Sequence, residues 1–65
     1  MLTYSVETSQ QLSNVLLRLK IAGVAARCVV RSEVLLIDIP DPGRFDEPEL
    51  FALIRQAVPS AQRET

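Results

Sequence analysis

Two runs of strand-forming residues meet at a short polar junction, and their pairing constrains the fold more than any other feature. The runs are 24–31 (VAARCVVR) and 33–39 (EVLLIDI). An even-length loop between them places Cys28 opposite Ile37, and directly opposed residues share one face of the sheet. An odd-length loop would bury Asp38 among apolar side chains, which is costly. We therefore predict a β-hairpin in the even register.

The even register divides the hairpin into an apolar face and a mixed face. The mixed face carries Arg27 opposite Asp38 and Val29 opposite Leu36, so Arg27 is expected to cover the charge of Asp38. Ser-Glu is an unfavourable two-residue turn, so a longer loop is an open alternative. The apolar face consists of Ala26, Cys28, Val30, Leu35, Ile37 and Ile39.

A strand and a helix are predicted before the hairpin. Residues 2–7 (LTYSVE) alternate between apolar and polar, which indicates a half-buried strand. Thr8 with Gln11 three residues later forms a capping-box pattern for a helix that ends near Gly23. Leu17 and Ile21 are expected to widen its buried stripe. That stripe is Leu12, Val15, Leu16 and Leu19.

Acidic residues and prolines are concentrated in residues 37–49 (IDIPDPGRFDEPE). Asp41 precedes Pro-Gly in a typical turn, and Asp46 with Glu49 fits the capping box of a second helix that ends before Pro59. Carboxylates can bind hard cations, but this spacing matches no calcium-binding loop. We therefore predict caps and turns here, with no metal and no cofactor.

The element order is strand, helix, strand, strand, helix, which predicts an α+β fold. A right-handed crossover and a hairpin give a three-stranded antiparallel sheet of order 1-3-2 with both helices on one face. This order is similar to the ferredoxin-like βαββαβ plan without its last strand. Residues 1–59 are expected to form a single domain, and residues 60–65 a frayed tail.

The predicted fold leaves the first strand, residues 2–7, as an unprotected sheet edge. Apolar side chains on the helix-free face add an exposed strip. We expect another chain to bind there, most simply a second copy as a homodimer, or an unidentified protein regulated or inhibited by this one. The candidate protein-binding residues are Thr3, Ser5, Arg27, Val29, Arg31, Val34 and Leu36.

Composition excludes several classes of function. The 65 residues include no histidine and one cysteine, Cys28, so neither a disulfide scaffold nor a structural zinc site is expected. Cys28 has no histidine to activate it, and we predict no enzyme and no catalytic residue. The first residues lack the pattern of a signal peptide, and no apolar run would span a membrane, so a cytoplasmic location is expected.

Two alternatives to protein binding are open. A nucleic-acid-binding regulator would use Arg27 and Arg31 with Arg18 and Lys20, although the formal net charge of −1 does not favour it. A ligand-sensing dimer would hold a small molecule near Asp38 and the 40–45 loop.

Overall fold

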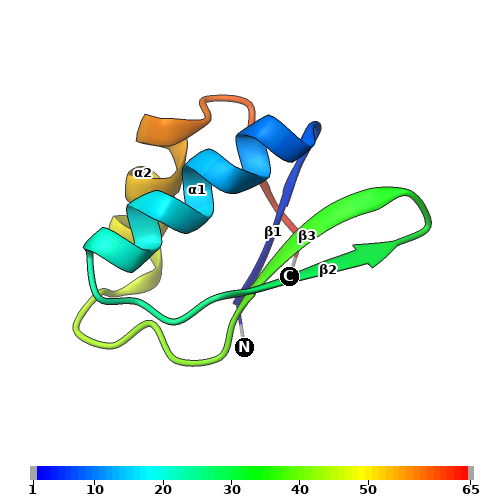
Figure 1. The fold of residues 1–65 in the computed structure, drawn as a ribbon. Coiled ribbons are helices and arrows are strands. Elements are labelled where there is room, and N and C mark those ends of the chain that lie inside the picture. The colour runs from blue at the N-terminus through cyan, green and yellow to red at the C-terminus, as the bar shows by residue number, and fades with distance from the viewer. Residues whose placement is uncertain (1, 65) are drawn as a thin grey trace.

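The computed structural model describes residues 2–64 and forms an α+β fold with one antiparallel sheet and two helices (Figure 1). Met1 and Thr65, which belong to the predicted domain and tail, lie outside the described residues. The elements are β1 (Leu2–Val6), α1 (Ser9–Ile21), β2 (Arg27–Arg31), β3 (Val34–Ile39), α2 (Glu47–Ala57) and β4 (Gln62–Arg63).

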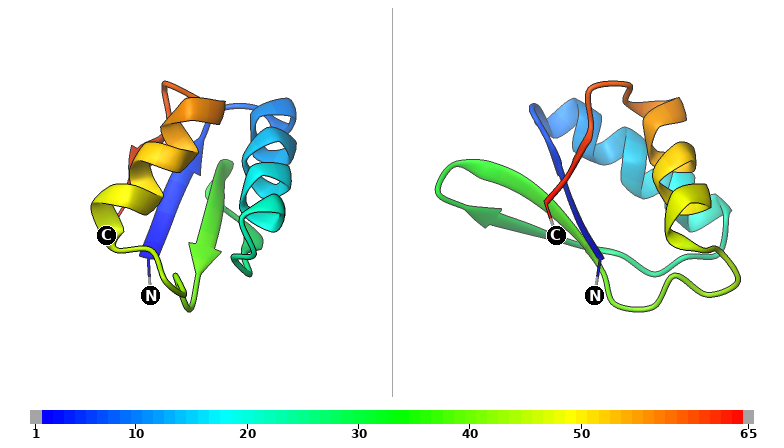
Figure 2. Two further views of the ribbon diagram at one scale, coloured as in Figure 1. Left: turned by 90° about the vertical axis from the view of Figure 1, so that its left-hand side faces the viewer. Right: turned by 180° about the vertical axis from the view of Figure 1, so that it is seen from behind.

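The sheet has the order β2-β3-β1-β4, and each pair of neighbours is antiparallel. β3 is the central strand between β1 and β2, as the sequence predicts. Both helices pack side by side over one face of the sheet, which Figure 2 shows from two further directions. The predicted three-stranded order is nevertheless incomplete, because a fourth strand extends the sheet beyond β1.

The prediction of a frayed tail at 60–65 is wrong where the structure describes it. Gln62 and Arg63 pair with Ser5 and Tyr4 of β1. The backbone N–H of Glu64 donates to the carbonyl of Thr3 at 2.8 Å, and Ser5 Oγ donates to the Glu64 carboxylate at 2.7 Å. The predicted open edge at β1 is therefore covered by the chain's own C-terminal residues.

The short loop between α2 and β4 is held in place at both of its ends. Val58 and Ala61 are buried in the core. Arg55, in the last turn of α2, donates from Nε and Nη2 to the carbonyl of Pro59 at 3.1 and 2.9 Å. The C-terminal segment has no repeating apolar pattern. It is nevertheless held in place by the buried side chains of Val58 and Ala61 and by the hydrogen bonds of Arg55.

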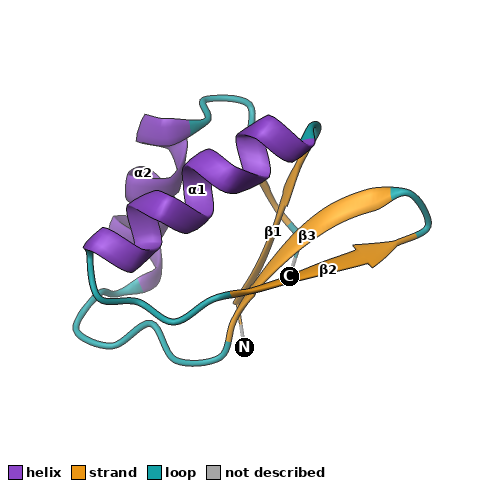
Figure 3. Ribbon diagram, in the orientation of Figure 1, coloured by secondary structure: helices purple, strands orange, loops and turns teal. Residues whose placement is uncertain are grey.

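The hairpin register agrees with the prediction, pair by pair from Arg27↔Asp38 to Arg31↔Val34. The loop consists of Ser32 and Glu33 only, so the longer loop is excluded. Figure 3 shows this short connection at the end of the hairpin. Ser32 and Glu33 have φ angles of 52° and 66°. Positive φ at both central positions is the geometry of a type I′ turn, which favours Asn-Gly and costs energy for other residues.

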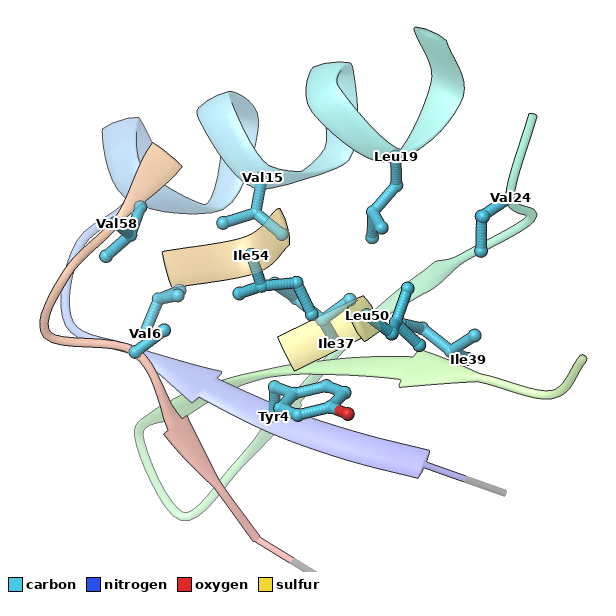
Figure 4. Close-up of a cluster of buried hydrophobic side chains, with 11 residues drawn as sticks. Tyr4, Val6, Val15, Leu19, Val24, Ile37, Ile39, Leu50, Ile54 and Val58 are labelled. Atoms are coloured by element: carbon cyan, nitrogen blue, oxygen red, sulfur yellow. The ribbon is translucent and has the colours of Figure 1, made fainter. Parts of the chain in front are cut away.

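The core lies between the helices and the sheet (Figure 4). Val15 and Leu19 of α1 and Leu50 and Ile54 of α2 are fully buried against it. Both helices begin as predicted, with Thr8 and Asp46 accepting the N–H of the residue three positions later. On the sheet, the fully buried side chains are Tyr4, Ile37 and Ile39.

The helices cover only part of the sheet. In Figure 1 the turn end of the β2–β3 hairpin extends away from both helices. Cys28 is exposed and Val30 is 67% exposed, although both belong to the predicted apolar face. Neighbouring strands in a sheet are rotated by roughly 20–25° relative to each other, so an outer hairpin turns out from under its helix layer.

The prediction for the width of the α1 stripe is also wrong. Leu17 is 59% exposed and Ile21 is 75% exposed, whereas Leu12 and Leu16 pack against the core as predicted. Because α1 packs mainly against α2, β1 and β3, it buries a narrow stripe of side chains, of which Val15 and Leu19 are the fully buried ones. Neither helix described in residues 2–64 has the length and apolar character needed to cross a membrane.

Substitution of two leucines of α1 tests this burial. Leu19→Ala should lower the free energy of unfolding by about 2–5 kcal/mol, because Leu19 is fully buried. Leu17→Ala is the matched control on the same helix and should cost less than about 0.5 kcal/mol. Urea unfolding followed by circular dichroism measures both values. Equal losses would mean that Leu17 is buried after all.

Replacement of the strained turn tests its geometry. The double change Ser32→Asn, Glu33→Gly should raise the free energy of unfolding by about 1 kcal/mol, because Asn-Gly adopts positive φ angles at little cost. Thermal unfolding of the wild type and the variant measures the difference. A less stable variant would contradict a two-residue type I′ turn.

Candidate protein-interaction surface

The acidic run that dominates the sequence serves local structure. The Asp46 carboxylate accepts the Glu49 N–H at 2.9 Å, and the Glu49 carboxylate accepts the Asp46 N–H at 3.3 Å, which completes the predicted capping box. Asp41 Oδ1 accepts the Gly43 N–H at 2.9 Å in the predicted turn. Within residues 2–64, no three acidic or cysteine side chains gather closely enough to hold a metal ion.

Asp38 differs from its predicted environment. It lies opposite Arg27 in the ladder, but its Oδ1 accepts a hydrogen bond from the Thr3 hydroxyl at 3.0 Å. In the described part of the chain, no ion pair links Asp38 to Arg27. A partly buried carboxylate in the central strand is thus stabilised from β1, on the other side from Arg27.

Glu47 joins α2 to β4 in a contact that the sequence did not reveal. Its Oε1 lies 3.3 Å from Nη1 of Arg63, and this ion pair sits beside the buried hydroxyl of Tyr4. Burial, followed by the negative charge of Glu47, raises the pKa of Tyr4 above its usual value of 10.0. Its ring stacks on Phe51 at 5.3 Å between centroids.

The Tyr4 hydroxyl is therefore a poor candidate for catalysis. Its residue is fully buried, so no substrate reaches it in this conformation. A tyrosine hydroxyl with the usual pKa of 10.0 is already neutral near pH 7, and burial moves the pKa of Tyr4 further from the working pH that a general base needs. The group closes the core beneath β4.

A shallow depression of about 520 Å³ lies on the helix-free face of the sheet. Leu36 forms its floor and is only 8% exposed, although no helix covers this face. Val34, at 43% exposed, adds an apolar wall near the turn. Arg31 contributes a positive charge, and Asp38 and Glu64 contribute negative ones, so the depression combines an apolar floor with charges of both signs.

Four of the seven predicted site residues line this depression, namely Thr3, Arg31, Val34 and Leu36. Arg27, Val29 and Ser5 lie on the same face by register but outside its lining. Sequence reasoning missed Ser32, Asp38 and Glu64 as lining residues. Asp38 lies two positions from Leu36 in the same strand and therefore on the same face, so the sequence could have predicted it. Glu64 follows a strand of only two residues, which is too short to show an alternating pattern.

The sheet has two edge strands, β2 and the two-residue β4, and β2 is the longer of the two. In residues 2–64 it pairs with β3 alone, while β4 covers β1 on the other side. The edge presents Arg27, Cys28, Val30 and Arg31 as exposed side chains. An exposed strand with one free row of backbone groups is a template for another strand.

The residues expected to act together in nucleic-acid binding, and those expected to act together in ligand sensing, lie on different parts of the structure. Arg18 and Lys20 lie on α1, whereas Arg27 and Arg31 point to the helix-free face of the hairpin. Tyr4 is fully buried, so its ring is not available for base stacking, and Phe51, which stacks on it, is partly buried. Asp38 lines the depression, while Pro42, Gly43, Arg44 and Phe45 line a different hollow beside α1.

Comparison with protein-family models, with curated proteins and with solved structures finds no match to this chain.

Titration of Tyr4, the single tyrosine of the chain, tests the buried hydroxyl. Its ionisation, followed by ultraviolet absorbance, should have a midpoint above 10.0 in the folded protein. Because the folded pKa is raised, the free energy of unfolding should be fully retained below about pH 10 and should fall as the pH rises further.

Tyr4→Phe is the control for this titration. Urea unfolding at about pH 8 and about pH 11 should show a smaller loss for the variant than for the wild type, because the other titrating groups are common to both. A wild-type midpoint at or below 10.0, or equal losses, would mean that the hydroxyl is hydrated.

Proposed function

We propose that this protein is a non-enzymatic protein-interaction module, a small regulator, adaptor or inhibitor, that binds another polypeptide through its β2–β3 hairpin. The binding surface would combine the helix-free depression with the β2 edge. This surface replaces the β1 edge expected from the sequence, which β4 covers.

One observation carries the proposal. The hairpin extends beyond the helices (Figure 1), and apolar side chains are exposed on both of its faces. Val30 is exposed on the helix side and Val34 on the opposite side. Exposed apolar patches bordered by charges are typical of protein contacts. Arg27 and Arg31 provide such a border.

A second exposed apolar pair, Leu17 and Ile21, lies on α1. It lines a hollow between the helices with Arg18, Gln56 and Ala57. This pair belongs to a regular helix whose backbone bonds are internal, so it offers side chains only. The hairpin offers side chains and an edge of backbone groups, which favours it as the binding surface.

We also infer that the fold is a compact variant of the ferredoxin-like βαββαβ plan. The element order and a sheet with β1 and β3 in the centre support this inference. The difference from the sequence prediction is that the last strand is present, although it is reduced to Gln62–Arg63.

Photo-crosslinking from Cys28 tests the proposed function. Cys28 is the only cysteine and is exposed on the hairpin, so a photoreactive maleimide attaches there without a new substitution. We expect a specific polypeptide from extracts of the native cells to crosslink, and unlabelled wild type to compete for it. Val34→Lys should compete about tenfold less well, which corresponds to roughly 1.4 kcal/mol.

A displaced label provides the matched control. Cys28→Ser, Ser13→Cys moves the same reagent to an exposed position on α1. Capture of the same polypeptide with equal yield from both positions, or equal competition by Val34→Lys, would contradict binding through the hairpin. A labelled oligonucleotide that crosslinks at low salt and is released at high salt would instead favour the nucleic-acid alternative.

A further inference from the structure

We propose that the partner of β2 is an extended segment with two acidic residues, four positions apart, that adds to the sheet as an antiparallel strand. This inference rests on the proposed function and names the chemistry of its partner. β-strand addition uses backbone hydrogen bonds for affinity and alternate side chains for specificity.

The free backbone groups of β2 follow from the hairpin turn. The residues that enclose a two-residue turn, Arg31 and Val34, are bonded across the hairpin, and bonding alternates along an antiparallel ladder. Arg27, Val29 and Arg31 therefore direct their backbone groups toward β3. Cys28 and Val30 direct theirs outward, to an edge that no other strand of residues 2–64 occupies.

Side-chain charges determine which strand fits. Residues opposite Arg27 and Arg31 would lie on the helix-free face beside their guanidinium groups. In the part of the chain that the structure describes, neither arginine forms an ion pair. Arg31 lies opposite Val34, so the hairpin supplies no carboxylate across from it. Acidic residues at both positions would form cross-strand pairs of opposite charge.

The same charges disfavour a second copy of this chain. A two-fold axis at Val29 gives the only self-pairing that uses all of Arg27–Arg31 with matching faces. That pairing opposes Arg27 to Arg31 of the other copy at both ends of the ladder. Directly opposed like charges destabilise a sheet, so the strand is better suited to an acidic partner than to itself.

Two short peptides test the charge requirement. A capped peptide with the core Glu-Ile-Val-Val-Glu should bind the isotope-labelled full chain and slow hydrogen exchange at the Cys28 and Val30 amides. The counterpart Lys-Ile-Val-Val-Lys should bind at least about tenfold more weakly, since two favourable pairs become unfavourable. Equal affinity, or unchanged exchange at both amides, would overturn the proposal.

Backbone methylation separates strand addition from contact with side chains. N-methylation of the second and fourth peptide residues, whose N–H groups would face β2, should abolish binding. Methylation of the central valine is the matched control and should leave affinity within about twofold. Binding that survives the first change and perturbs Val34 and Leu36 instead would overturn strand addition while the proposed function stands.

Reversal of one charge tests the argument against self-pairing. The wild type should sediment as a monomer at micromolar concentration. Arg31→Glu would oppose the new acid to Arg27 of a second copy, and should dimerise at least about tenfold more tightly than the wild type. Arg18→Glu, the same charge change on α1, should not. A wild-type dimer with protected Cys28 and Val30 amides would make a second copy the occupant and overturn the acidic partner.

Discussion

The pairing of β2 with β3 determines the rest of this structure. Because the loop has two residues, Ile37 and Ile39 face the helices and Asp38 faces away from them. A shift by one residue would exchange these faces and place a carboxylate in the core. β3 also pairs with β1 along its length, so the same register determines which side of β1 meets α1 and α2.

β3 has a neighbouring strand on each side, which explains why its sequence, VLLIDI, is almost entirely apolar. Its helix-side residues form the core, and Leu36 on the opposite side is nearly as well buried among its neighbours. Asp38 is compatible with this position because the Thr3 hydroxyl donates to it at 3.0 Å. The outer strands need no such composition, and β2 carries an arginine at each end.

Sequence patterns predicted the parts of the fold that repeat over several residues. The hairpin register, the two helix caps and the buried stripes of Val15 and Leu19 follow from periods of two and 3.6 residues. β4 was missed because two residues carry no period, and its pairing depends on Arg55, Ala61 and an ion pair between distant residues.

Exposure at the hairpin could not be predicted, for a different reason. The sequence places Cys28 and Val30 on the apolar face, and the structure agrees about the face. Whether a helix reaches that face depends on sheet twist and on where α1 begins and ends, which are properties of the assembled layers. The face of the sheet on which the candidate residues lie was therefore predicted by the register, whereas the predicted open edge at β1 is covered by β4.

Stability alone does not account for the hairpin. Burial of a valine side chain contributes about 1.5–3 kcal/mol, and a small domain has little to spare. Val30 nevertheless remains exposed, and the turn holds Ser32 and Glu33 at positive φ. The acidic run, by contrast, is satisfied by caps, a turn and an ion pair. Departures from local stability are common at functional sites. Leu17 and Ile21 of α1 are exposed as well, but within residues 2–64 exposed apolar side chains and non-glycine residues with positive φ occur together only at the hairpin.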